Sequence, residues 1–67
     1  VLKVVQSDNI IVVKTLPGIA SGVASCLDGL GWSEILGSVA GDDTIFVLVR
    51  SKEDAEDIAG RLQAFLK

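Results

Sequence analysis

Histidine is absent from this sequence of 67 residues, and cysteine occurs only once, at Cys26. Without histidine or a second cysteine, the chain lacks the ligands of a typical zinc site and cannot form an internal disulfide bond. No serine or cysteine lies in a recognisable nucleophile motif, and no histidine could act as its base. We therefore expect that the protein is not an enzyme.

Basic residues are also scarce, with six Lys and Arg against nine Asp and Glu and a net charge of −3. Because proteins bind nucleic acid through basic patches, we expect no nucleic-acid binding by this chain itself. There is no signal peptide and no uninterrupted run of 18 apolar residues, which argues against secretion and membrane insertion. One unpaired cysteine suits a reducing, cytoplasmic compartment.

Apolar residues, in contrast, are abundant and make up 49% of the chain. A domain of this length buries only about 60% of the surface of its unfolded chain, so its own core is marginal. Since a stabilising disulfide bond or zinc site is excluded, oligomerisation is the remaining common source of stability. The sequence opens with Val1 and not with Met, so we expect it to be a fragment of a longer protein.

Two kinds of hydrophobic period alternate along the chain. Strands are predicted over Leu2–Gln6, Ile10–Thr15, Ile35–Ala40 and Thr44–Arg50, and helices over Ile19–Leu30 and from Ser51 to the end. The short turn between the first two strands predicts an antiparallel hairpin. The order β-β-α-β-β-α predicts an α+β two-layer sandwich, with a four-stranded, mainly antiparallel sheet covered by two helices.

The last strand is apolar on both faces, with Ile45, Val47 and Val49 pointing one way and Phe46 and Leu48 the other. One face can pack against the helices, and we expect a partner to cover the other face.

The first helix has little charge, since Asp28 is its only charged residue. Its outer face carries the small residues Ser21, Gly22, Ser25 and Cys26. A solvated helix normally has Lys and Glu there, so we expect another subunit to cover this side too. Cys26 itself is expected to be a small buried hydrophobe.

Two adjacent carboxylates, Asp42 and Asp43, lie at a turn between two apolar strands. No basic residue occurs between Lys14 and Arg50 to neutralise them locally. The pair could be solvated, could join Asp28 around a hard cation, or could bind a guanidinium or ammonium group through charge-assisted hydrogen bonds. The spacing matches no calcium loop, and the residues alone leave these alternatives open.

The chain resembles the C-terminal domain of bacterial arginine repressors. The resemblance rests on four motifs in collinear order, namely Thr15-Leu16-Pro17-Gly18, Leu27-Asp28 followed by Leu30, Ile35-Leu36-Gly37 and Gly41-Asp42-Asp43-Thr44. It covers nearly the whole chain and implies the same β-β-α-β-β-α fold. The stretch from Gly41 to Thr44 is the most specific of the four motifs.

The resemblance also implies a ligand, L-arginine, held between trimers that stack into hexamers, and no metal. The paired acids would hold the arginine, the carboxylate of the first helix would contribute, and the neighbours of the pair would shape the site. The residues assigned in this way are Asp42, Asp43, Asp28, Gly41, Thr44 and Ser21. Family members often carry His or Gln at the position of Ser21, whose shorter side chain reaches less far.

The function implied by the resemblance is that of a regulatory domain in a cytoplasmic, arginine-dependent repressor of arginine biosynthesis. Residues 1–67 would be the arginine-binding and oligomerisation domain, and the family's N-terminal winged helix-turn-helix, which binds operator DNA, is absent from this chain. The partners would be copies of itself, as a homotrimer and a dimer of trimers. The alternative is a structural oligomerisation module that needs no ligand and in which the acidic pair is a solvated turn.

Overall fold

The computed structural model describes the backbone of residues 1–66 and the side chains of residues 1–64. Its elements are β1 (Lys3–Ser7), β2 (Ile10–Lys14), α1 (Ala20–Gly29), β3 (Ile35–Ala40), β4 (Thr44–Val49) and α2 (Lys52–Leu66). The predicted α+β fold and its β-β-α-β-β-α order are confirmed, and the predicted starts and ends that fall on described residues are shifted by at most one residue. The predicted end of the last helix, at residue 67, lies outside the described residues.

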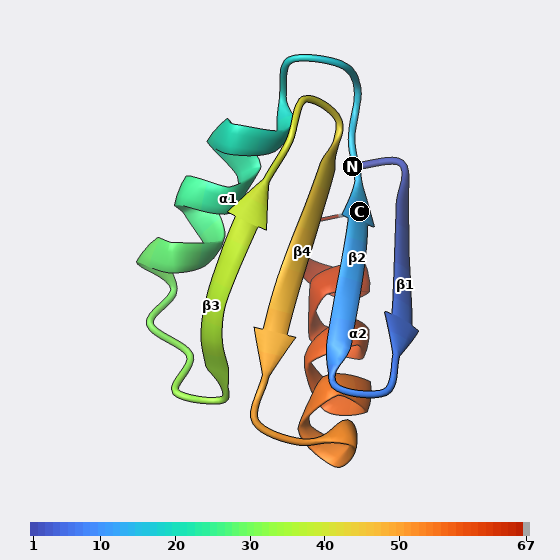
Figure 1. Ribbon diagram of the computed structural model, residues 1–67, viewed down its shortest axis with the longest axis vertical. Coiled ribbons are helices and arrows are strands. Elements are labelled where there is room, and N and C mark those ends of the chain that lie inside the picture. The colour runs from blue at the N-terminus through green and yellow to red at the C-terminus, as the bar shows by residue number, and fades with distance from the viewer. Residues whose placement is uncertain (67) are drawn as a thin grey trace.

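The four strands form one antiparallel sheet in the order β1-β2-β4-β3. Both helices lie on the same face of this sheet, α1 beside β3 and β4, and α2 behind β1, β2 and β4 (Figure 1). In the central pair, Lys14 of β2 lies opposite Thr44 of β4. This register brings the end of β2 next to the start of β4 and to the hairpin that precedes it.

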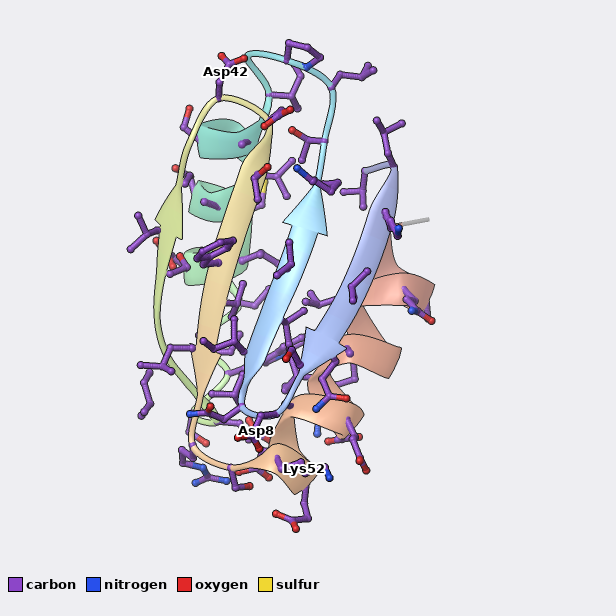
Figure 2. The ribbon with its side chains drawn as sticks, turned by 45° about the vertical axis from the view of Figure 1, so that its right-hand side comes forward. Asp8, Asp42 and Lys52 are labelled. Carbon is purple, nitrogen blue, oxygen red and sulfur yellow. The ribbon has the colours of Figure 1, made fainter. Side chains whose placement is uncertain are left out.

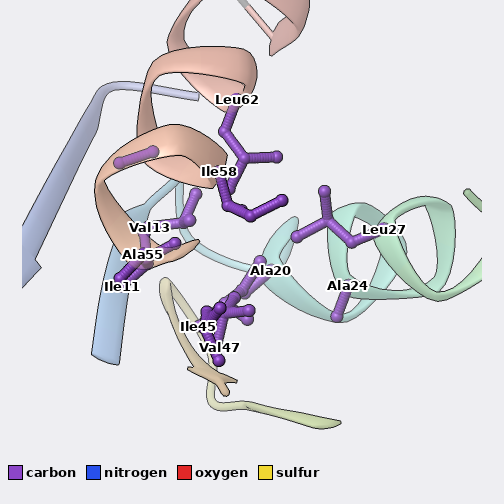
Figure 3. Packing of buried hydrophobic residues seen from close by; sticks show 12 residues of the cluster. Ile11, Val13, Ala20, Ala24, Leu27, Ile45, Val47, Ala55, Ile58 and Leu62 are labelled. Carbon is purple, nitrogen blue, oxygen red and sulfur yellow. The ribbon is translucent and has the colours of Figure 1, made fainter. Parts of the chain in front are cut away.

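The core lies between the sheet and the two helices (Figure 3). Its buried side chains come from alternate positions of the strands and from one stripe of each helix: Ile11, Val13, Ile45, Val47, Val49, Ala20, Ala24, Leu27, Ala55, Ile58, Ala59 and Leu62. On the last helix, apolar spacing in the sequence predicts a stripe of Ala55, Ile58, Ala59, Leu62, Phe65 and Leu66, and burial confirms it as far as Leu62. Its last two members, Phe65 and Leu66, lie outside the described side chains.

The other face of the sheet, which we call the open face, is also apolar. Its exposed large side chains are Val5, Ile10, Leu36, Val39, Phe46 and Leu48. Val39 is 75% exposed and Phe46 57% exposed, which is unusual for side chains of this size. The prediction that both faces carry apolar residues is confirmed, while the cover of the open face by a partner stays a prediction.

The prediction that Cys26 is buried is wrong for the single chain, because this side chain is exposed. The buried positions of α1 are Ala20, Ala24 and Leu27, which follow one line along the helix. Cys26 lies off that line, on the side turned away from the sheet. The helix ends at Gly29, one residue before the predicted end, and Gly31 lies in the left-handed region at φ 67° just beyond its last turn.

Ser51 caps the start of α2. Its hydroxyl accepts a hydrogen bond of 3.1 Å from the backbone N–H of Asp54, three residues further on. This contact satisfies one of the N–H groups that the first turn of a helix leaves without an internal partner.

Replacing Ser51 with alanine is expected to lower the free energy of unfolding by about 1 kcal/mol, because the N–H of Asp54 loses its acceptor. Urea unfolding at a fixed protein concentration measures the change. Ser51→Asp keeps a capping oxygen and should remain close to the unaltered chain. Equal stability of Ser51→Ala and the unaltered chain would show that the cap contributes nothing.

Candidate functional site at the acidic hairpin

Asp42 and Asp43 lie at the tip of the β3–β4 hairpin, where both side chains are exposed. The N–H of Gly41 donates to the carbonyl oxygen of Thr44 at 2.8 Å and closes the turn around them. Figure 2 shows Asp42 at one end of the sheet, far from Asp8 in the turn of the other hairpin. The two carboxylates thus project from a short, closed turn.

Backbone hydrogen bonds hold this tip against the segment that leads into α1. The N–H of Thr15 donates to the carbonyl of Asp43 at 2.8 Å. The carbonyl of Asp42 accepts from the N–H groups of Gly18, at 2.9 Å, and of Ala20, at 3.5 Å. Because only main-chain atoms take part, the position of the tip is fixed while both aspartate side chains remain available.

The segment can reach the tip because it makes a tight turn at Pro17-Gly18. The carbonyl of Leu16 accepts a 3.2 Å hydrogen bond from the N–H of Ile19, and Gly18 has φ 81°. Proline in the second place and a positive φ in the third are typical of a type II turn, which favours glycine there. The Pro-Gly motif therefore serves to aim two N–H groups at Asp42.

Thr44 contacts the acidic pair directly, and Lys14 contacts Thr44. The Thr44 hydroxyl donates to Oδ1 of Asp43 at 2.9 Å, and Nζ of Lys14 donates to the same hydroxyl at 2.8 Å. Among the side chains described, no basic group lies within 4.0 Å of an oxygen of Asp42 or Asp43 as an ion pair. The hairpin therefore presents two negative charges that are not directly neutralised.

The two α1 residues of the predicted site lie at different distances from the hairpin. Ser21 follows Ala20, whose N–H reaches Asp42, and its side chain is exposed beside the tip. Asp28 lies eight residues beyond Ala20, which places it about 12 Å along the helix axis. There, its Oδ1 accepts a 3.2 Å hydrogen bond from the hydroxyl of Ser38 in β3. Within one chain, Asp28 is thus an acidic residue separate from the hairpin.

This arrangement suits an organic cation. Two carboxylates on a fixed turn can accept the paired N–H groups of a guanidinium, which matches carboxylate geometry better than an ammonium does. The described residues contain no group of three or more His, Cys, Asp or Glu side chains that could hold a metal ion. None of the described helices is long and apolar enough to span a membrane.

A second polar cluster, which the sequence did not reveal, surrounds Arg61 on α2. Its guanidinium lies 5.3 Å from the ring centre of Trp32 and contacts Asp57 at 2.6 Å and Glu34 at 3.3 Å. The spacing of Asp57 and Arg61 along one helix was a signal for part of it. Since the cation is already satisfied, this cluster joins α2 to the α1–β3 connection and offers no open binding group.

Comparison with known proteins identifies the family of the chain. The family model described as arginine repressor, C-terminal domain, matches residues 1–64. The arginine repressor of Desulforudis audaxviator is 54% identical over 67 residues, which cover 100% of this chain and 45% of that protein. The arginine repressor of Moorella thermoacetica is 51% identical over 63 residues, which cover 94% and 42%. The chain spans less than half the length of these relatives.

Proposed function

The chain belongs to the family of arginine repressor C-terminal domains, and on that premise we propose that it binds L-arginine and assembles with copies of itself. In this proposal it is the regulatory domain of a cytoplasmic repressor of arginine biosynthesis, and not an enzyme. Operator DNA would be bound by the family's N-terminal domain, since the net charge of −3 makes this chain a poor partner for DNA.

The observation that carries the proposal is the acidic hairpin. Its two carboxylates are exposed, and neither forms an ion pair with a described side chain. In the proposed complex, Asp42 and Asp43 accept hydrogen bonds from the guanidinium of arginine. Gly41 and Thr44 shape the turn, and Ser21 borders it. Asp28 would pair with the α-amino group, the other positive charge of the ligand.

Assembly and ligand binding would support each other. Trimers that stack into a hexamer bring several acidic hairpins near one another, and their like charges repel. A cationic ligand lying between the trimers removes this repulsion and bridges subunits, so binding favours the hexamer and the hexamer favours binding. The exposed apolar side chains of the open face, such as Phe46 and Leu48, supply surface that association can bury.

A second candidate function is assembly without a ligand. The open face favours it, because apolar association through Val39 and Phe46 needs no contribution from the acidic pair. In that case, Asp42 and Asp43 are a solvated turn.

Sedimentation velocity of the chain, with and without L-arginine, tests the proposed function. L-citrulline is the control, because it keeps the shape of arginine and lacks the guanidinium charge. We expect arginine, and not citrulline, to shift the chain toward the hexamer. Oligomers that are the same with and without arginine would favour the second candidate. A stable monomer under all conditions would contradict both functions.

A further inference from the structure

Three side chains connect the central strands to the acidic hairpin. Lys14 Nζ donates to the hydroxyl of Thr44 at 2.8 Å, and that hydroxyl donates to Oδ1 of Asp43 at 2.9 Å. A hydroxyl has a single proton and two lone pairs. Once it accepts from the ammonium of Lys14, its proton is directed to Asp43. The contacts therefore form a row of two hydrogen bonds, each donated in the direction from the ammonium of Lys14 to the carboxylate of Asp43.

The sheet fixes the geometry of these two hydrogen bonds. Lys14 and Thr44 are cross-strand partners in the central β2–β4 pair, and Lys14 follows the buried Val13, so its side chain projects from the open face. Threonine is branched at Cβ, which restricts its first side-chain torsion. Two of the three groups are thus held by regular strands and only Asp43 belongs to the turn.

The ammonium of Lys14 does not neutralise the acids. No ion pair within 4.0 Å joins Lys14 to Asp42 or Asp43 among the described side chains. The contact uses one oxygen of Asp43, and both Asp43 and Asp42 remain exposed.

We propose that Lys14 is a positioning residue of the arginine site, which orients the carboxylate of Asp43 through the hydroxyl of Thr44. This inference rests on the proposed function and adds a residue that lies outside the acidic motif. Lys14 touches neither the acids nor, in this role, the ligand. It holds one carboxylate in a single orientation before the guanidinium arrives, which reduces the ordering that binding requires.

The sign of the effect separates this role from simple repulsion. As a mere positive charge, Lys14 would repel arginine, and its removal would tighten binding. At an exposed surface, water and salt weaken the repulsion between Lys14 and a guanidinium that binds beyond Asp43. The hydrogen bonds act at contact distance and are less affected, so we expect the positioning effect to exceed the repulsion.

The test measures L-arginine binding by calorimetry at physiological salt for Lys14→Met, which removes the ammonium and keeps an apolar stem. We expect the dissociation constant to rise about three- to tenfold, the range for one exposed hydrogen bond. Lys14→Arg should restore most of the affinity. Lys3→Met is the matched control, because Lys3 is the exposed partner of Lys14 in β1 and is one strand further from Thr44. Binding by Lys14→Met that is unchanged or tighter would overturn the proposal.

A double-variant comparison tests whether Lys14 acts through Thr44. Thr44→Val removes the hydroxyl, and Thr44→Ser keeps it. If the two residues act in series, Lys14→Met combined with Thr44→Val binds arginine no more weakly than Thr44→Val alone. If the losses of binding free energy in the two single variants add fully in the double variant, Lys14 acts without the hydroxyl, which would overturn its action through Thr44.

A measurement without ligand keeps this proposal distinct from the proposed function. Three-bond NMR couplings report whether the first side-chain torsion of Asp43 occupies one rotamer. We expect one rotamer in the unaltered chain and in Lys3→Met, and averaging in Lys14→Met. Averaging in the unaltered chain would overturn the positioning role even where arginine binds. Failure of the unaltered chain to bind arginine would overturn the proposed function, while an Asp43 rotamer lost in Lys14→Met would still support the positioning of Asp43.

Discussion

An Asp43→Asn variant is expected to bind L-arginine at least about tenfold more weakly than the unaltered chain, with little change in its stability. The amide keeps the size of the side chain but loses the charge, and a hydrogen bond to a charged group contributes about 1.5–3 kcal/mol. The fold should persist because Thr15 N–H bonds to the main-chain carbonyl of Asp43, which asparagine retains. Calorimetry measures the affinity, and urea unfolding measures the stability.

The other hairpin supplies the matched control. Asp8 lies in the β1–β2 turn, at the opposite end of the sheet from Asp42 (Figure 2). Its φ of 54° lies in the left-handed region, which asparagine also tolerates. Asp8→Asn therefore makes the same change in net charge without strain and should leave arginine binding intact. Equal affinities of Asp43→Asn and Asp8→Asn would contradict the assignment of the site.

The Ile58→Ala variant is expected to lose most of the stability of the chain. Ile58 is fully buried on α2 and belongs to the same core cluster as Leu27 of α1 and Ile45 of β4 (Figure 3). Removing its side chain costs about 2–5 kcal/mol, because burial is lost and a cavity remains. A domain of this size has a total stability of only about 3–10 kcal/mol. Urea unfolding should be followed at one protein concentration, since the proposed assembly would also stabilise the fold.

Gly60 offers a control on the exposed side of the same helix. A Cβ at this position would meet nothing within 4 Å, and the residue is exposed. Gly60→Ala should raise the free energy of unfolding by up to about 1 kcal/mol, because alanine favours the helix. Loss of stability in Gly60→Ala, or none in Ile58→Ala, would contradict the orientation of α2 described here.

Local periodicity was enough to predict the elements of this fold. The alternation of Ile45 and Val47 with Phe46 and Leu48 distinguishes two faces of a strand, and burial in the structure follows it. The strand order β1-β2-β4-β3 could not be derived in the same way, because it depends on pairing between distant segments. Cys26 was misplaced because α1 has small residues on its outer face, and its sequence gives little contrast between the two sides.

The candidate site was predictable to the extent that it is local. Asp42 and Asp43 lie next to each other in the sequence, so their place at a turn followed from the strands on either side. The contact of Lys14 with Thr44 spans 30 positions and depends on the register of β2 against β4. A shift of that register by one residue would turn Lys14 to the other face of the sheet. Spacing in the sequence does not contain this information.

The main-chain anchoring of the hairpin tip has a consequence for how the family can diversify. Every amino acid has a backbone carbonyl, so substitutions at positions 42 and 43 retain both acceptors that fix the tip. In the proposed site, single substitutions at these positions would therefore change ligand preference while the scaffold stays the same. The hairpin would then be a natural site for libraries of variants that seek regulators of other small molecules, because selection there would act on chemistry at nearly constant stability.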